Sequence, residues 1–242
     1  MSGAPGPFGR ATRVPPVTGT RSGALTGAVT LAAMIATPLA PRGGRLRRWL
    51  SSVVVSGLCA TTASATARRW GGPRTAAAAV TVSGATALVE RIGTATGVPF
   101  GRYHYTAALR PQVGGVPAIV PLAWFAMAVP AREAAHAALG ARSNRTTRVL
   151  LGAIALTAWD LFLDPQMVGE GYWRWARRGR YRGIPLSNFA GWLLTSLGVM
   201  ASLEVFLPVD AGPVDAGLVG AGLVGAGPVG ACLLYTSPSP RD

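Results

Sequence analysis

The sequence predicts an all-α, polytopic transmembrane bundle of about six spans, and three observations carry that prediction. Of the 242 residues, 50% are hydrophobic and 13% are charged, about half of the roughly 25% charged residues of a soluble domain. The apolar residues form long blocks, most of them close to the roughly 20 residues that cross a bilayer. Arginine clusters separate the blocks, as is typical of loops that face anionic head groups.

Six apolar blocks are the predicted spans. They cover residues 23–40, 49–67, 75–90, 116–131, 149–163 and 189–207. The first block could also be a signal peptide, because Arg21 precedes it and small residues end it, but Pro41 fits poorly after a cleavage point. The third and fifth blocks are short and alanine-rich.

The composition of the two ends differs from that of the blocks. Residues 1–22 are rich in Pro, Gly and Arg and are expected to be a disordered basic tail, before an integral membrane domain over residues 23–207. Residues 208–242 form a low-complexity tail, too glycine-rich for a good helix. Its last segment, 232–242, resembles the translation of a sequencing adapter.

The formal net charge is +14, and every basic residue is an arginine. Because these arginines lie between apolar blocks and form no continuous basic face, we expect no nucleic-acid partner. Cys59 and Cys232 are the two cysteines, which excludes a disulfide framework and a cysteine metal site.

Two carboxylates stand near the end of the fifth block. Asp160 and Asp164 are four positions apart, so a helix would present them on one face. Acids within apolar spans are costly and therefore candidates for function. Asp164 could instead be the N-cap of a further helix over residues 165–178, with Pro165 at its first position and Tyr172, Trp173 and Trp175 as interfacial anchors.

A third acid, Glu90, ends the third block and precedes an aromatic segment that contains Phe100, Tyr103 and Tyr105. Glu90 could pair with a loop arginine, and the tyrosines could form an interfacial belt. The same residues could instead line a substrate cavity.

Two further segments combine prolines with aromatic or amide side chains. Pro117 and Pro121 lie within the fourth block and predict a broken or kinked helix beside a cavity, flanked by Trp124. Before the last block, Asn188 is either an N-cap or a site residue, with Trp192 one turn later. Glu204, near the end of that block, either stays buried or reaches the interface.

Four ordered motifs lie within residues 90–192. They are Pro99-Phe100-Gly101-x-Tyr103-x-Tyr105-Thr106, then Gly115-Val116-Pro117 with Pro121-Leu122-Ala123-Trp124, then Asp160-Leu161-x-x-Asp164-Pro165, and finally Gly183-Ile184-Pro185-x-x-Asn188-Phe189-x-Gly191-Trp192. Together they resemble the carotenoid biosynthesis membrane proteins of the bisanhydrobacterioruberin hydratase type. The resemblance implies a hydro-lyase that adds water to the terminal double bond of an acyclic carotenoid end group.

The side chains suit that reaction. A protonated buried acid can donate to an alkene, and aromatic faces stabilise the resulting cation. We therefore expect Asp160 to be the acid, Asp164 its partner and Glu90 a third catalytic candidate. The expected substrate-binding residues are Phe100, Tyr103, Tyr105, Trp124, Trp159, Asn188 and Trp192. The chemistry requires no cofactor and no metal site.

The resemblance also implies a location and partners. We expect a multi-pass protein of the cell membrane that takes its acyclic carotenoid from the bilayer, alongside other membrane enzymes of the carotenoid pathway. Two alternatives from other classes remain. A membrane prenyltransferase would use the aspartate pair to hold Mg²⁺ and diphosphate, although it needs a second acidic cluster. A proton-coupled transporter would use Glu90, Asp160 and Glu204.

Overall fold

The computed structural model describes residues 21–209, and within this range the chain forms six α-helices. They are α1 (Arg21–Ala36), α2 (Arg45–Trp70), α3 (Gly72–Thr96), α4 (Ile119–Leu139), α5 (Arg145–Gly169) and α6 (Leu186–Phe206). Two short 3-10 helices, η1 (Thr37–Leu39) and η2 (Gly140–Arg142), follow α1 and α4. Each predicted apolar block overlaps one helix, so the predicted all-α class is confirmed.

The two predicted tails fall almost wholly outside the described residues. This holds for residues 1–20 and for residues 210–242, which include the adapter-like segment 232–242. The predicted membrane domain, residues 23–207, falls inside the described range.

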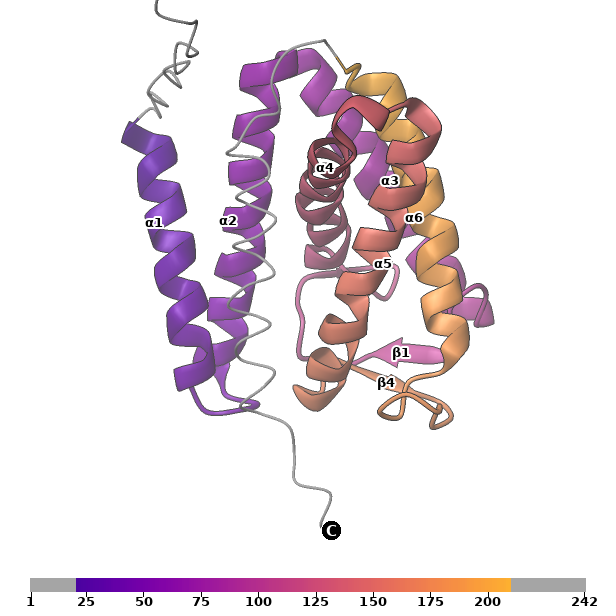
Figure 1. Ribbon diagram of the computed structural model, residues 1–242. Helices are drawn as coiled ribbons and strands as arrows, with labels where there is room; N and C mark the ends of the chain where they lie inside the picture. Colours follow the sequence, from indigo (N-terminus) through magenta and orange to yellow (C-terminus); the bar gives the residue numbers. More distant parts are fainter. Residues whose placement is uncertain (1–20, 210–242) are drawn as a thin grey trace, which may run out of the picture.

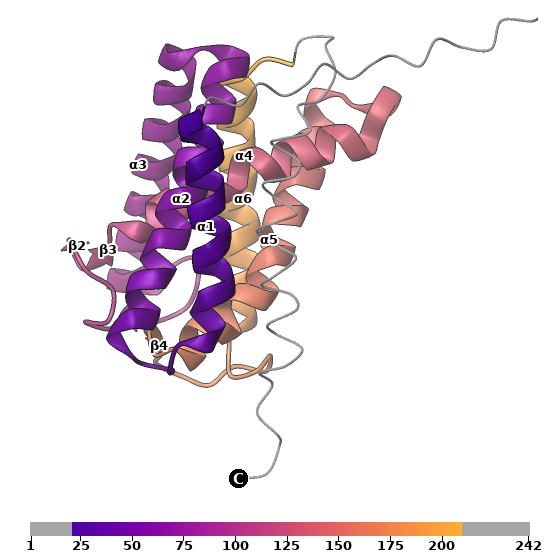
Figure 2. The same ribbon diagram turned by 90° about the vertical axis from the view of Figure 1, so that its left-hand side faces the viewer.

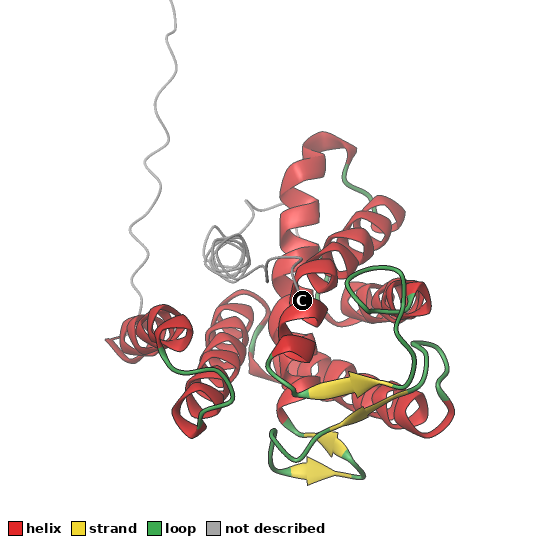
Figure 3. Cartoon of the chain, turned by 90° about the horizontal axis from the view of Figure 1, so that it is seen from below, coloured by secondary structure: helices red, strands yellow, loops and turns green. Residues whose placement is uncertain are grey.

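Helix α4 is the element around which the others pack. It contacts α2, α3, α5 and α6, whereas α1 packs on α2 at the edge of the molecule (Figures 1 and 2). Helices α5 and α6 form the most extensive pair. Seen from below, the α1–α2 pair stands to one side of the other four helices (Figure 3). The main core is formed by residues from α2, α3, α4, α5 and α6. It contains small and aliphatic side chains, among them Ala78, Val82, Leu156, Met200 and Leu203.

Local sequence signals explain several helix ends. Gly97 ends α3 in the left-handed region, with φ of 84°, where a side chain would be strained. Asn144 caps α5 in a capping box: its side chain accepts from the Thr147 amide at 3.0 Å, and the Thr147 hydroxyl accepts from the Asn144 amide at 2.9 Å.

Four short strands lie toward one end of the bundle within the described residues, and the sequence predicted none of them. β1 (Tyr103–Tyr105) pairs antiparallel with β4 (Trp173–Trp175), so that Tyr103 lies opposite Trp175 and Tyr105 opposite Trp173. β2 (Gln112–Val113) and β3 (Val116–Pro117) form a second small hairpin. Figure 1 shows β1 and β4 beneath the helices. The β1–β4 pair joins the segment after α3 to the segment after α5.

Within residues 21–209, three helices are long and apolar enough to cross a membrane: α2, α5 and α6. Large apolar side chains on the helices point outward, among them Val80, Leu88, Leu150, Phe162 and Leu194. An exposed apolar surface of this extent suits a lipid environment. The chain is therefore a membrane protein, and the other three predicted spans stay predictions.

Two predictions about prolines are wrong. Pro117 and Pro121 do not break a helix, because Pro117 lies in β3 and α4 begins at Ile119, which puts Pro121 in its first turn. No helix starts at Pro165 either, since α5 continues through it to Gly169. Proline at 165 removes the donor for the Leu161 carbonyl, and the Tyr181 hydroxyl donates to that carbonyl at 3.2 Å instead. Tyr172, Trp173 and Trp175 consequently lie at and beside β4, where they border the site.

A buried ion-pair network lies at the end of the bundle opposite the strands. Arg132 of α4 and Arg148 of α5 both donate to Glu204 of α6, at 2.7 and 3.0 Å. Arg132 also pairs with Glu133 and donates to the Leu207 carbonyl. Glu204 is thus a buried carboxylate paired with two arginines and does not extend to the interface.

Candidate active site

The carboxylates of Asp160 and Asp164 lie side by side on α5, and each residue is 1% exposed. A single amide joins them, because the Asn188 Nδ2 atom of α6 donates to Asp160 Oδ2 and to Asp164 Oδ2, at 2.8 Å each. The Trp173 indole of β4 donates to Asp164 Oδ1 at 2.6 Å. Helix spacing therefore pairs the two acids as predicted, and α6 and β4 hold them in place.

The two capping interpretations are wrong. Asp164 lies inside α5, so its carboxylate caps no helix and accepts from Asn188 and Trp173 instead. α6 begins at Leu186 with Pro185 at the capping position, which puts Asn188 in the first turn with its amide on the aspartates.

The four carboxylate oxygens of the pair differ in their partners. Three of them accept N–H bonds from Asn188 or Trp173. The fourth, Asp160 Oδ1, is buried without a hydrogen-bond partner among the described residues. A buried oxygen without a donor is unfavourable for a carboxylate but suits a protonated carboxyl group. Asp160 Oδ1 is therefore the oxygen best placed to carry a proton.

Glu90 is surrounded by donors. The hydroxyls of Tyr103 and Tyr105 both donate to Glu90 Oε2, the latter at 2.8 Å, and the Trp124 indole donates to Oε1 at 3.3 Å. All three are hydrogen bonds that Glu90 accepts, and they favour its ionised form. The predicted pairing of Glu90 with a loop arginine is wrong, since Glu90 is buried among aromatic donors.

The two tyrosines belong to the site and not to an interfacial belt. Burial raises the pKa of Tyr103 and of Tyr105, and the neighbouring Glu90 carboxylate raises both further. Both phenols therefore stay protonated at neutral pH and remain donors to Glu90.

Phe100 is wedged between two helices beside these tyrosines. Its ring lies against Gly93 of α3 and Gly191 of α6, so close that a Cβ atom on Gly93 would lie 2.8 Å from the ring and one on Gly191 2.7 Å. The Gly191 position also lies against the Pro99 backbone. Small residues at both positions are therefore required for the ring to enter.

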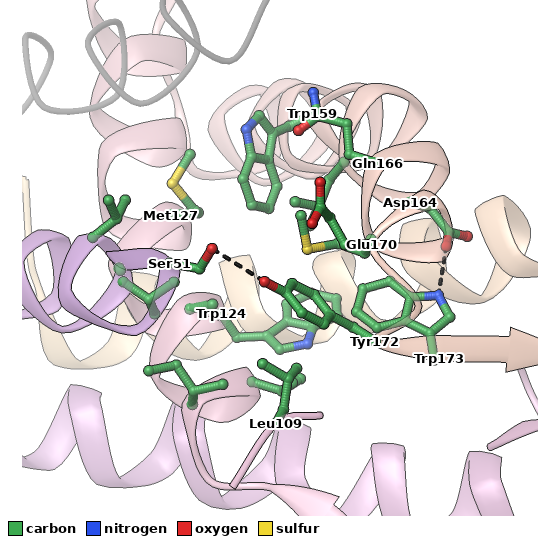
Figure 4. A pocket seen from close by; sticks show the side chains of 18 of the residues that line it. Ser51, Leu109, Trp124, Met127, Trp159, Asp164, Gln166, Glu170, Tyr172 and Trp173 are labelled. Atoms are coloured by element: carbon green, nitrogen blue, oxygen red, sulfur yellow. Dashed lines mark hydrogen bonds between the residues drawn. The ribbon is translucent and has the colours of Figure 1, made fainter. Parts of the chain in front are cut away.

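These groups border one apolar cavity of about 240 Å³ (Figure 4). Of the ten predicted site residues, nine line it: Glu90, Phe100, Tyr103, Tyr105, Trp124, Trp159, Asp164, Asn188 and Trp192. Asp160 does not line it and lies behind Asn188 and Asp164. Of the two aspartates, Asp164 is therefore the one that borders the cavity.

Three tryptophans form one wall of the cavity. Trp124 of α4 stacks on Trp192 of α6, with ring centroids 4.0 Å apart, and Trp159 of α5 meets Trp192 edge-on at 6.5 Å. Their faces offer a region of negative potential that favours a cation.

The other end of the cavity is polar and was missed by sequence reasoning. Arg47 of α2 pairs with Glu170 at 2.8 Å and donates to the carbonyls of Thr37, Pro38 and Ala40. The Tyr172 hydroxyl donates to Ser51 Oγ at 3.2 Å (Figure 4). We name these four residues, Arg47, Glu170, Ser51 and Tyr172, the polar clamp. It joins α2 to the segment that follows α5.

Comparison with known proteins identifies the family. Residues 49–217 match the family described as carotenoid biosynthesis protein, which is more than half of the chain. The chain belongs to the carotenoid biosynthesis protein family. The matched range includes all ten predicted site residues, together with Trp173 and Gly191.

One curated relative extends the comparison. This carotenoid biosynthesis protein is 36% identical over 109 residues to bisanhydrobacterioruberin hydratase from Haloarcula japonica. The aligned segment covers 44% of this chain and 37% of that relative, so the chain spans well under half of the relative's length. No solved structure matches.

Besides the polar clamp, sequence reasoning missed the part that Trp173 plays beside Asp164 in this carotenoid biosynthesis protein. Pro165 predicts a helix over residues 165–178, and that prediction hid the strand. The alternation of Tyr172, Arg174 and Ala176 with Trp173 and Trp175 was the available signal, since an alternating aromatic pattern is typical of a strand.

Proposed function

We propose that this chain is a multi-pass protein of the cell membrane that adds water to the terminal double bond of an acyclic carotenoid. One observation carries the proposal: a buried carboxylate pair and a separate carboxylate, Glu90, border the same aromatic-lined apolar cavity. Family membership and the similarity to a hydratase named for an acyclic carotenoid support it.

The first step needs an acid strong enough to protonate an alkene. Two carboxyl groups bridged by one amide and removed from water repel each other if both are ionised, so we expect the pair to hold one proton. Asp160, the expected acid, holds the proton of the pair on Oδ1, and Asp164, which faces the cavity, relays it to the less substituted alkene carbon, while the π electron pair forms the new C–H bond. Asp160 keeps the pair supplied with its proton.

The second step needs a protected cation and a water molecule. Protonation leaves a tertiary carbocation, which the faces of Trp124, Trp159 and Trp192 stabilise, by roughly 0.5–2 kcal/mol each. Glu90 adds a negative charge whose position is fixed by its three donors.

Water closes the reaction. Its oxygen forms the C–O bond to the cation and its proton passes to a carboxylate, so the acid that was consumed is restored. The net change is the addition of one water molecule, with no oxidant and no cofactor.

The two alternative functions have less support. Among the described residues, no three acidic, histidine or cysteine side chains are grouped to hold a metal ion, as the second cluster of a prenyltransferase would require. The transporter hypothesis relied on Glu204, which pairs with Arg132 and Arg148 at the far end of the bundle. Partnership with other enzymes of the pathway stays a prediction.

Expression in cells that accumulate an acyclic carotenoid tests the proposal. Mass analysis should find pigments heavier by one water and more polar on chromatography, with nearly unchanged visible absorption because the conjugated system is not touched. An unchanged pigment profile, with the protein shown to be in the membrane, would contradict hydration. A product with altered conjugation would indicate a desaturase or a cyclase.

A further inference from the structure

On one side, the cavity is bordered by α2 and α5, which do not pack closely on each other. α2 packs on α1, α3 and α4, and α5 packs on α4 and α6, while cavity-lining residues lie between α2 and α5. Both helices are long and apolar enough to cross a membrane. This side of the cavity therefore faces sideways, toward the surrounding lipid, and not along the axis of the bundle.

The two facing edges are apolar. They consist of Val54, Val55 and Leu58 on α2 and of Leu156, Trp159 and Leu163 on α5. All but Leu156 are half-buried, so these side chains are reachable from outside the bundle. We call this opening the α2–α5 slot. On α2, its residues recur at the spacing of one helix face, which leaves Ser56 exposed on another face.

The polar clamp closes the slot at the end near the strands. Arg47 and Glu170 are each 11% exposed at the side chain, and their pairing joins the start of α2 to the end of α5. The Tyr172–Ser51 bond lies beside it. An apolar chain leaving the cavity therefore meets charged and hydroxyl groups in this direction and aliphatic side chains in the other.

The cavity cannot hold a whole carotenoid. Its volume of about 240 Å³ lies below the roughly 300–1,000 Å³ of pockets that enclose a drug-sized ligand. A carotenoid is considerably longer than such a ligand, so only its end group fits beside Asp164 and Glu90. The rest of the polyene needs an apolar path to the lipid.

We propose that the α2–α5 slot binds the polyene chain of the substrate and admits its end group sideways from the bilayer. This inference rests on the proposed function for the identity of the substrate. The polyene lies against Val55, Leu58, Trp159 and Leu163 while the end group reaches the carboxylates.

A competing path runs along the outside of α3 and α6. An apolar groove there is lined by Ala85, Val89 and Ile92 on α3 and by Leu194 and Gly198 on α6, together with Val98 and Pro99. Phe100, held between Gly93 and Gly191, separates that groove from the cavity. The structure therefore favours the α2–α5 slot.

Tryptophan substitutions distinguish the two paths. Leu58→Trp fills the slot, Gly198→Trp fills the α3–α6 groove, and Ser56→Trp is the matched control on the exposed face of α2. Each purified protein is given bisanhydrobacterioruberin in liposomes, and retained pigment and added water are both measured. A short acyclic isoprenoid hydrocarbon with the same terminal double bond is assayed in parallel, because it fits inside the cavity without using the slot.

Leu58→Trp should lower pigment retention and pigment hydration by about tenfold or more, as expected for overpacking an occupied slot, and should leave conversion of the short hydrocarbon near wild type. Ser56→Trp and Gly198→Trp should leave all three measurements near wild type. Equal losses on both substrates with Leu58→Trp, or the selective loss with Gly198→Trp, would overturn the proposal. If the wild type retains pigment through the slot but hydrates neither compound, the slot stands and the proposed function fails.

Discussion

The two acidic groups of the site have different surroundings, although both are buried. Around Asp160 and Asp164 the donors satisfy three of four oxygens, whereas Glu90 is met by two phenols and an indole. Pairs of titratable groups in such different environments are a recurring basis for acid and base roles at neutral pH. The pair has one buried oxygen without a donor, whereas both Glu90 oxygens accept hydrogen bonds that favour the ionised form.

The first prediction concerns the aspartates. Asp164→Asn and Asp160→Asn each remove the acidic proton with little change of shape, so each should lower hydration by the roughly 10²–10⁴-fold typical of general acid–base catalysis. The double variant should lose little more than either single variant, because the two residues act as a unit. Turnover per folded protein in membranes is the measurement. Near-normal turnover in Asp164→Asn would exclude this residue as the donor.

The second prediction separates charge from binding. Glu90→Gln removes the negative charge but keeps one acceptor for the surrounding donors, so turnover should fall by roughly 10²-fold or more while pigment retention stays near wild type. Tyr105→Phe removes one of the three donors and should have the smaller effect. Parallel assays of retained pigment and product measure both properties. If pigment retention falls together with turnover, Glu90 instead maintains the shape of the cavity and is not needed for its charge.

Single residues were predicted well where one helix carries them. The four-residue spacing of Asp160 and Asp164 suffices to bring them together, because helix geometry fixes it. The partners of these acids come from α6 and β4, and no local pattern shows which distant amide or indole will arrive. The alternative capping roles were reasonable for Asp164-Pro165 and for Asn188, but tertiary packing outweighed both.

At the scale of elements, Phe100 determines how closely α3 and α6 approach at the site. Its ring occupies space that Gly93 of α3 and Gly191 of α6 leave open. The segment between α3 and β1 is therefore held in place by a ring that fits only because both positions are glycine. Tyr103 and Tyr105 follow directly, and their positions over Glu90 depend on this wedge.

The third prediction tests the wedge. Gly191→Ala puts a Cβ atom 2.7 Å from the Phe100 ring and 3.0 Å from the Pro99 carbonyl, so the segment must shift, at a cost of about 1–3 kcal/mol in unfolding free energy. Product formation should fall with it. Gly198→Ala on the same helix meets nothing within 4 Å and should be neutral or slightly stabilising. Thermal unfolding in detergent measures both, and equal melting temperatures would refute the wedge.

Hydropathy predicted the existence of all six helices well, but it predicted the positions of their ends less well. Every apolar block became a helix, but α5 extends past the predicted end at residue 163 to Gly169. The sequence signal at Pro165 was misleading, since the freed Leu161 carbonyl is satisfied by Tyr181, sixteen residues after that proline. The two-residue strands β2 and β3 are too short for a periodic pattern to reveal, whereas β4 carries an alternating aromatic pattern.

At the scale of the whole molecule, charge is concentrated at both ends of an apolar bundle. The carboxylates lie near the strands, and the network of Arg132, Glu133, Arg148 and Glu204 lies at the opposite end. That network joins α4, α5 and α6, so we expect it to stabilise the bundle without taking part in the reaction.

The fourth prediction separates these roles. Arg148→Gln removes one of the two arginines that pair with Glu204 and should lower the unfolding free energy by roughly 1.5–3 kcal/mol, because Arg132 still compensates the carboxylate. Arg145→Gln, one turn earlier at an exposed position, should have almost no effect. Turnover per folded molecule should be unchanged in both. Reduced turnover in folded Arg148→Gln would indicate that this network communicates with the site.

The bridge from Asn188 to both aspartates also constrains how the protein is made. α5 leaves the ribosome before α6, so its two acids enter the membrane before the amide that joins them has been synthesised. An aspartate within a spanning helix opposes insertion, by roughly 2.5–3.5 kcal/mol at the helix centre and by less toward an end. We therefore expect α5 to be retained at the translocon until α6 arrives, so that the two helices enter the lipid as a pair.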